Sequence, residues 1–581
     1  MTRTRARAAA PRLTTSLLIL CAALSQAPLA AAQEPRSVIP WLQGEDQPVG
    51  EPIQPAQPGD ARANIQAPPI PDGAAQPASP QLQGATQGAA PVAAGAQDDA
   101  LPTFAAPGPN DPARVEVAAL GPVGVGAAGT LTPAEVGLPK DAWRGTDAAT
   151  AVSLIESVAP SDLHAANRLA VRLLSAAFTP PSDGAAVFNA RIAALSRFGA
   201  VGAATSIGET AGVAVAVNEP AWRAAALVSG RDAVFCQEVV DNGAPAGDLE
   251  NIYCRARLGD APTALLLIQT QRSLGGADPQ VLDLLEAVAD PTYTSFVEAP
   301  GDASAVTPLE LAALRVTGVP LPAGFGDTAP LVLMGAVPDV QASPRETLAA
   351  LERLEAAGAL ETAGLRTAYD GAASAESGGL WGRVEVYRRV IDGGGAAQLT
   401  NAAAALAKAD EAGREAQMAR LLAPTIAGSP VEGDAQTRRL LRLGGELGEA
   451  SRRMTGAESP EERGLDRVAN RDALSLWALQ DAAPLTAKTV RGDQVAGRQL
   501  AALIAFGLAV PDPQLYPGRN DLSFVLADGR HAEVAFEALS RLRAGSAAPP
   551  EDLNQALRAL LALGLDAEAR QIAVEATLLG R

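Results

Sequence analysis

The feature that most constrains the fold of this chain is a recurring turn. A glycine ends one segment rich in Ala and Leu, and the next such segment begins within a few residues. Gly199, Gly230 and Gly259 are 31 and 29 residues apart, and Gly529 and Gly564 are 35 apart. Glycine readily adopts the left-handed conformation that ends a helix. The spacing is the length of a helix pair with two short turns, which is typical of tetratricopeptide-like solenoids.

Composition favours helices packed closely on helices. Aromatic residues make up only 3% of the chain, whereas β-sandwiches and barrels favour β-branched and aromatic side chains. After Ser161, a candidate N-cap, the apolar residues at helical spacing are Leu163, Ala166, Leu169, Ala170, Leu173 and Leu174. We therefore predict an all-α, irregular helix-pair solenoid. A plain helical bundle is the alternative, because the Trp, Tyr and Pro positions of a full tetratricopeptide consensus are missing.

The first 32 residues have the three parts of a secretory signal peptide. Four arginines precede an apolar run over residues 17–24, which is too short to span a bilayer as a stable helix. Three alanines at 30–32 have the small side chains that signal peptidase requires, so we predict cleavage before Gln33 and export to the periplasm. Acylation at Cys21 is not expected, because a leucine stands where a lipobox needs Gly, Ala or Ser.

The charge of the chain argues against several classes of partner. Removal of the signal takes away four arginines and no acidic residue, so the net charge changes from −19 to −23. No basic cluster is concentrated enough to bind nucleic acid, and the same deficit of cations argues against anionic lipid surfaces. No second apolar stretch reaches about 18 residues without a charge, Pro or Gly. We predict a soluble mature protein without a transmembrane segment.

Composition also divides the rest of the chain. Residues 33–42 form a short apolar motif. Residues 43–130, rich in Ala, Pro, Gln and Gly, show no period and are predicted to be a disordered linker. Two helical-repeat halves are expected over residues 131–300 and 346–581, joined by an irregular segment over 301–345 that contains several helix breakers.

The 33–42 motif carries four candidate partner-binding residues, Val38, Ile39, Trp41 and Leu42. Three roles are open for it. It is a residual spacer, or it caps an exposed helix face of the same chain, or it anchors a partner through Trp41 while the linker supplies reach.

Two cysteines remain after signal cleavage, Cys236 and Cys254, in predicted helices separated by a turn at 242–245. An antiparallel helix pair joined there places them at comparable distances from the turn. In an oxidising compartment this arrangement predicts a structural disulfide. A redox-active pair would usually have Cys-x-x-Cys spacing, and a metal site would need further ligands.

No motif indicates catalysis. Residues 124–129 match G-x-G-x-x-G, but neither a helix nor a βαβ pattern follows, so no cofactor is expected. His164 and His531 stand alone, and each is expected on a helix surface, so no metal site is predicted. Glu-Ser pairs occur, yet none has the sequel found in lytic transglycosylases. We therefore expect that the protein is not an enzyme.

Aromatic and arginine residues are concentrated over residues 378–389. Trp381, Tyr387 and Arg388 are candidate partner-binding residues, because Trp, Tyr and Arg are the usual anchors of protein interfaces. The alternative is that Trp381 fills a seam between helical repeats.

Five features of this chain occur together: the signal, the motif at 37–42, the Ala/Pro-rich linker, the helix end over 253–260 and the Gly-Gly-Leu-Trp run at 378–381. This combination resembles a group of exported alphaproteobacterial helical-repeat proteins without an established activity, some of which are labelled antifreeze glycopeptide polyprotein. We do not infer ice binding from the label, because the regular Thr arrays of flat ice-binding surfaces are missing.

These patterns predict a non-catalytic periplasmic scaffold or adaptor. It would bind envelope proteins through a helical-repeat surface and a tethered N-terminal peptide. The alternative is a cell-wall glycan-binding module or a glycan-acting enzyme. Aromatic side chains lining one groove would favour glycan, and a groove lined by polar and acidic side chains would favour a protein partner.

Overall fold

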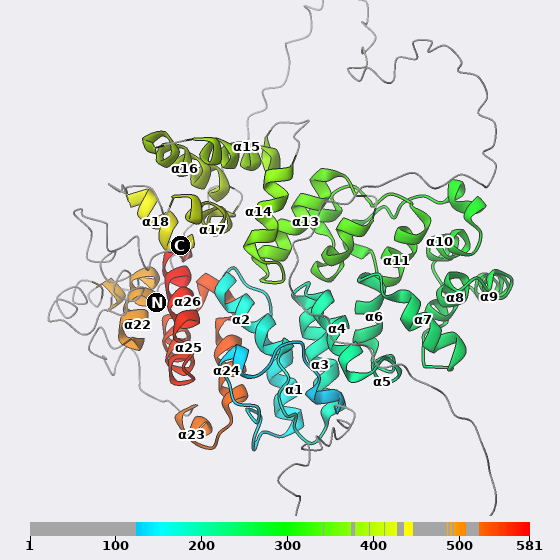
Figure 1. Cartoon of the computed structure of the whole chain (residues 1–581), viewed down its shortest axis with the longest axis horizontal. Helices are drawn as coiled ribbons and strands as arrows, with labels where there is room; N and C mark the ends of the chain where they lie inside the picture. Colours follow the sequence, from blue (N-terminus) through cyan, green and yellow to red (C-terminus); the bar gives the residue numbers. More distant parts are fainter. Residues whose placement is uncertain are drawn as a thin grey trace, which may run out of the picture. The chain divides into compact units, whose positions relative to one another are not determined.

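The structure is a computed structural model that describes residues 124–340, 342–372, 378–393, 395–411, 413–426, 435–444, 485, 488–490, 493–506 and 522–580. Every regular element in these residues is a helix, apart from one isolated bridge between Leu131 and Ala176 (Figure 1). The predicted all-α class is therefore confirmed. The signal peptide and the 33–42 motif lie outside the described residues.

The first elements follow one another through short turns. They are η2 (Val125–Ala127), η3 (Ala134–Val136), α1 (Ala148–Ser157), α2 (His164–Ser175), α3 (Gly184–Arg197), α4 (Val201–Ala211), α5 (Val213–Ala216) and α6 (Pro220–Val228). The Asp147 side chain caps α1 by accepting a hydrogen bond from the Thr150 N–H at 2.9 Å. The predicted apolar face of α2 is buried, although the helix begins after Leu163 and not after Ser161.

The next helices pack on their neighbours in the sequence, α7 on α8, α8 on α9, α9 on α10 and α10 on α11. Their bounds are α7 (Asp232–Asp241), α8 (Asp248–Arg257), α9 (Ala261–Leu274), α10 (Pro279–Ala289), η4 (Pro291–Phe296), η5 (Ala303–Ala305) and α11 (Pro308–Thr317). The Thr307 hydroxyl and the Glu310 carboxylate form a reciprocal capping box at the start of α11.

The remaining described elements fall into two sequence groups. The first consists of α12 (Phe325–Thr328), η6 (Leu331–Asp339), α13 (Pro344–Ala356), α14 (Thr362–Gly371), α15 (Gly379–Asp392), α16 (Gly395–Asp410), α17 (Glu415–Ile426) and α18 (Ala435–Gly444). The second consists of α22 (Gln494–Ala505), α23 (Leu522–Ala527), α24 (His531–Arg541), η8 (Leu542–Ala547), α25 (Pro550–Ala562) and α26 (Asp566–Leu579).

The glycine turns have the predicted geometry. Gly199, Gly230 and Gly259 have φ values of 77°, 76° and 90°, and Gly529 and Gly564 have 79° and 80°. After each of the first three, the next N–H returns to a helix carbonyl five residues earlier, at 2.9 to 3.0 Å. This bond is the mark of a Schellman helix end, so the glycine pattern located these helix ends correctly.

The C-terminal helices return to the first helices. In Figure 1, α26 (red) lies beside α2, and α24 lies beside α1. Trp143 stacks on Phe536 of α24 with ring centroids 5.4 Å apart. One hydrophobic core therefore joins α1–α11 with α22 and α24–α26, while α13–α18 have a separate core. A third hydrophobic cluster contains residues of η5, α11, α12, η6 and α13. The last helices thus complete the core of the first half, and the expected irregular segment at 301–345 contributes to a cluster of its own.

The folded region begins earlier than the predicted linker end at residue 130. A Cβ on Gly126 would lie 2.6 Å from the Gly184 Cα, and one on Gly129 would lie 2.5 Å from the Ala177 N. The buried Arg191 guanidinium donates hydrogen bonds to the Gly126 and Ala128 carbonyls at 3.0 and 2.9 Å. The G-x-G-x-x-G match therefore reflects close backbone packing.

None of the helices in the described ranges is long and apolar enough to cross a membrane.

Candidate functional site

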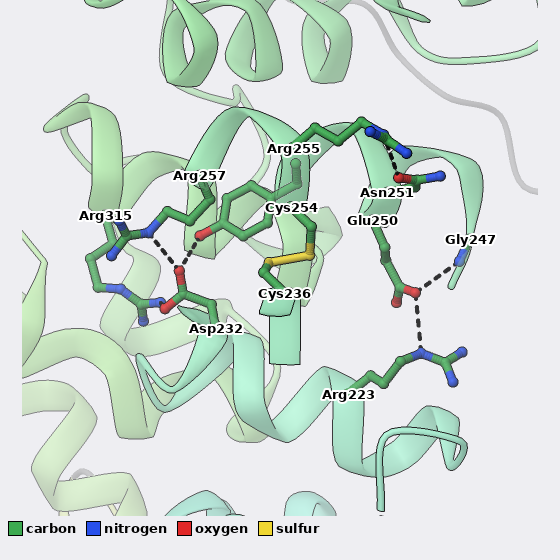
Figure 2. The surroundings of a disulfide bond; sticks show 11 residues. Arg223, Asp232, Cys236, Gly247, Glu250, Asn251, Cys254, Arg255, Arg257 and Arg315 are labelled. Carbon is green, nitrogen blue, oxygen red and sulfur yellow. Dashed lines mark hydrogen bonds and ion pairs between the residues drawn. A yellow bond between two sulfur atoms is a disulfide. The ribbon is translucent and has the colours of Figure 1, made fainter. Parts of the chain in front are cut away.

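The predicted cysteine pair lies at bonding distance. Cys236 on α7 and Cys254 on α8 have sulfur atoms 2.09 Å apart and Cα atoms 4.7 Å apart. Both side chains are fully buried between the two helices (Figure 2). The pair thus lies within one helical hairpin, as the sequence predicted, and has no access to a ligand.

A buried ionic network lies next to this pair. The Asp232 carboxylate accepts hydrogen bonds from the Tyr253 hydroxyl at 2.7 Å, from Arg257 Nε at 2.8 Å and from Arg315 Nη2 at 3.2 Å (Figure 2). Arg315 also donates to the Leu227 carbonyl at the end of α6. These mutual contacts make the network a structural joint between α6, α7, α8 and α11.

The candidate partner-binding residues on α15 are packed inward. Trp381 and Tyr387 are buried, and the Tyr387 ring meets Tyr369 edge-on with centroids 5.2 Å apart. Its hydroxyl donates to Asp370 at 2.9 Å, and Arg388 donates to backbone carbonyls at the end of α14. Trp381 packs in the second core, as expected for a side chain that fills a seam between helices. Partner binding by Trp381, Tyr387 and Arg388 stays a prediction. The residues of the 33–42 motif lie outside the described part of the chain.

A cavity of about 440 Å³ lies among α2, α14, α17, α18 and α26, within the size range of small-molecule pockets. Its lining residues are His164, Ala165, Arg168, Leu169, Arg172, Thr362, Arg366, Arg420, Pro424, Gly444, Ala567, Glu568, Gln571 and Glu575. On each long helix the lining residues are four positions apart, so they share one face. The return of α26 to α2 therefore completes this cavity.

The deep end of the cavity holds an arginine that is paired on one side only. Arg420 Nε and Nη2 each donate to the Glu355 carboxylate at 2.9 Å, whereas Arg420 Nη1 has no hydrogen-bond partner among the described residues. The Gln417 amide and the Thr362 hydroxyl also donate to Glu355, both at 2.8 Å. Burial acts to raise the pKa of Glu355, but the charge and hydrogen bonds of Arg420 outweigh it and bring the pKa to about 2.

A second carboxyl group, that of Glu575, is fully buried on the other side of Arg420. Its Oε1 lies 4.0 Å from Arg420 Nη1, and its Oε2 accepts a hydrogen bond from the Ala165 N–H at 3.0 Å. Burial raises the pKa of Glu575 to about 7, because Arg420 is too distant to compensate for the loss of hydration.

His164 does not lie on the helix surface, as the sequence had suggested. Its side chain is only 6% exposed, and among the described residues neither buried ring nitrogen has a partner within hydrogen-bond geometry. The Glu355 backbone is near enough to act on the pKa of the ring. The nearest acid is Glu355, 3.9 Å from Nε2. Burial, followed by the charge of Arg420, lowers the pKa of His164 to about 3, so the ring is neutral. His531, by contrast, is half-buried and contacts the Gly529 carbonyl at 2.9 Å.

The mouth of the cavity is more exposed and rich in arginine. Arg168 pairs with Glu361 at 2.7 Å, and Arg172 pairs with Glu568 at 2.8 Å. Arg366 Nε is buried without a hydrogen-bond partner. Four arginines and two glutamates therefore line the cavity, and its described lining residues include no Phe, Trp or Tyr.

No sequence pattern indicates this site, because its residues come from helices far apart in the chain. The available signal was the four-residue spacing of His164, Arg168 and Arg172 on one helix. That spacing also fits an ordinary solvated helix face. It indicates a binding site only once the packing of α17 and α26 near this face of α2 is known.

The described residues contain no group of three or more His, Cys, Asp or Glu side chains that could hold a metal ion. No family model, curated protein or solved structure matches this chain. The resemblance to exported alphaproteobacterial proteins therefore remains a prediction.

Proposed function

We propose that this chain is a non-catalytic binding protein that holds an anionic group of its ligand in the cavity between α2, α14, α17 and α26. The observation that carries the proposal is the set of buried polar atoms without partners. The two ring nitrogens of His164, Nη1 of Arg420 and Nε of Arg366 are all buried there. Such atoms are rare in native interiors because each costs about 1–3 kcal/mol. A ligand that accepts hydrogen bonds would satisfy them.

The charge of the lining supports an anion. Four arginines line the cavity, and Arg168, Arg172 and Arg420 each have a glutamate partner. Burial raises the pKa of Glu575 to about 7, so this carboxyl group is in part protonated at neutral pH and opposes an anion less. Guanidinium groups bind carboxylate and phosphate oxygens well, since their N–H groups match the geometry of these anions.

The arrangement offers little for catalysis. Glu355 is held by Arg420, Gln417 and Thr362, so it is not available as a base or nucleophile. The Thr362 hydroxyl is the one hydroxyl group among the described lining residues, and it donates to Glu355. A neutral glycan is also a poor match, because aromatic stacking platforms are missing from the described lining.

The adaptor role is part of the proposal. The anionic group belongs either to a free small molecule or to a carboxylate-bearing segment of an envelope protein. Export to the periplasm, a helix-pair solenoid of the tetratricopeptide type and a tethered N-terminal peptide are likewise proposed. A buried cysteine pair at bonding distance is compatible with an oxidising compartment.

Calorimetry of the mature chain tests the binding. Lactate and sulfate should bind, and N-acetylglucosamine, a neutral glycan unit, should not. Arg366→Ala should weaken lactate binding about tenfold, because one charged hydrogen bond is worth about 1.5–3 kcal/mol. Arg389→Ala is the matched control, since this exposed arginine on α15 pairs only with Glu385, outside the cavity. Binding of the sugar without the anions would overturn the proposal.

Affinity capture from crosslinked periplasm distinguishes the two sources of the anion. An envelope protein that is captured by the native chain and by Arg389→Ala, but not by Arg366→Ala, would carry the carboxylate. Loss of lactate binding in Arg366→Ala without any change in the captured proteins would indicate a free small molecule.

A further inference from the structure

We propose that the anion is a carboxylate and that it binds at the deep end of the cavity together with one proton, which Glu575 holds. This inference rests on the proposed function and specifies both the ligand class and the group that makes its binding depend on pH.

The geometry at the deep end is that of one cation between two acids. Arg420 donates hydrogen bonds from Nε and Nη2 to the Glu355 carboxylate. Its Nη1 lies 4.0 Å from Oε1 of Glu575. Both carboxyl groups are fully buried, and Arg420 is 9% exposed. If both were ionised, these buried groups would carry a net charge of −1, which is costly. A proton on Glu575 restores neutrality.

When Glu575 is protonated, the deep end of the cavity offers hydrogen-bond donors to a carboxylate ligand. Its Oε2 already accepts from the Ala165 N–H at 3.0 Å. Its Oε1 accepts a hydrogen bond from the Gln571 amide at 3.4 Å, and in the protonated form this oxygen would also carry the proton and donate it. The Arg420 Nη1–H and one ring N–H of the neutral His164 are the other free donors. All three groups belong to residues that line the cavity, and donors of this kind suit the two oxygens of a carboxylate.

The ionised form of Glu575 would oppose the same ligand. A carboxylate beside Arg420 Nη1 would then lie next to a second negative charge, with Glu355 already using the other edge of the guanidinium. Like charges at this distance in a buried site repel strongly. Binding of a carboxylate must therefore favour the protonated state, and by linkage protonation must favour binding.

Other charged groups near Glu575 do not remove this linkage. Among the interactions that act on its pKa, the charge of Arg420 lowers it and that of Glu355 raises it. The elements packed against α26 are α2, α18, α22, α25 and η8. The buried residues of α25 and η8 carry no charge. The charged or titratable side chains that α2, α18 and α22 bring toward α26 are His164, Arg168, Arg172, Arg439, Arg442 and Arg498.

Several of these groups have partners of their own. Arg439 pairs with Glu415 at 2.5 Å, and Arg168 and Arg172 pair with Glu361 and Glu568 at the mouth. His164 stays neutral above about pH 3 because burial lowers its pKa. Glu575 is therefore the group whose protonation changes near neutral pH, where burial places its pKa at about 7.

Lactate is the probe that tests the proton, because its own carboxyl group stays ionised above about pH 6. Its affinity for the mature chain is measured by calorimetry from about pH 6 to pH 9, in pairs of buffers with different ionisation enthalpies. We expect uptake of one proton per lactate above the pKa of Glu575 and an affinity that falls about tenfold per pH unit there.

The variant Glu575→Gln tests the role of the Glu575 proton independently of the other groups in the site. The amide can donate at every pH, so we expect lactate binding to be retained and its pH dependence to disappear. Glu385→Gln, at an exposed position of α15 outside the cavity lining, is the matched control and should keep the native slope. Buffer-dependent heats of the unmodified chain report the proton even if Glu575→Gln does not fold.

The possible failures are distinguishable. If neither lactate nor sulfate binds, the proposed function fails. If lactate binds without proton uptake, or if Glu575→Gln keeps the native pH dependence, the anion site stands and the protonated carboxylate receptor is overturned.

Discussion

Glu355 and Glu575 lie on opposite edges of the same guanidinium, yet only Glu355 is hydrogen-bonded to it. Arg420 donates twice to Glu355 at 2.9 Å and approaches Glu575 no closer than 4.0 Å. The two carboxyl groups are equally buried, but the pKa of Glu355 falls to about 2 and that of Glu575 rises to about 7. A difference in hydrogen bonding thus gives two glutamates opposite protonation states at pH 5 to 6.

The raised pKa of Glu575 predicts a stability that declines with rising pH. The folded chain keeps this proton up to about pH 7, whereas the unfolded chain releases it near the ordinary value of 4.5. Stability from the proton is therefore full below about pH 4.5 and is lost as pH rises to about 7, a change of about 3 kcal/mol. Urea unfolding of Glu575→Gln from pH 4 to 8 should lack this decline. An identical decline in the variant would contradict the assignment.

Removal of the central cation should be strongly destabilising. Arg420→Ala leaves Glu355 buried without its charge partner, and we expect a loss of about 3–5 kcal/mol. The double variant Arg420→Leu with Glu355→Leu removes both charges and should lose less than Arg420→Ala alone. Chemical denaturation measures both, and a double variant as unstable as the single one would show that packing, not charge, dominates.

Two buried polar residues on α2 should respond in opposite directions. His164→Leu removes ring nitrogens that have no hydrogen-bond partner, so we expect a gain of about 1 kcal/mol together with loss of ligand binding. Asn167 donates to the Ser161 and Ala356 carbonyls at 2.7 and 2.9 Å, so Asn167→Ala should lose about 2 kcal/mol. Thermal and urea unfolding report both. Equal losses would mean that His164 has a structural role.

The glycine turns predict a position-specific cost. A Cβ on Gly199 would lie 2.6 Å from Leu354 Cδ2, at a φ of 77°, so Gly199→Ala should destabilise by more than about 1 kcal/mol. Gly202 lies inside α4 with open space around it, and Gly202→Ala should stabilise by up to about 1 kcal/mol. The two melting temperatures should shift in opposite directions. A stabilising Gly199→Ala would refute the left-handed turn.

Several features could be predicted from the sequence alone, because they depend on interactions within a single helix or turn. The 3.6-residue spacing of Leu163, Leu169 and Leu173 predicted the buried face of α2, because period and face are properties of a single helix. Gly199 and Gly564 marked helix ends, since only glycine takes that conformation cheaply. Cys236 and Cys254 could be paired because one short turn separates their helices.

Long-range packing decided the rest. His164 and Glu575 line one cavity although they are more than 400 positions apart, and no sequence period reports that α26 returns to α2. Trp381 was equally consistent with an interface anchor and a core residue, and the packing of α15 in the second core placed it inside. A helix sequence determines which residues share a face, but the helix that covers that face determines whether an arginine there faces solvent, pairs with a carboxylate or lines a cavity.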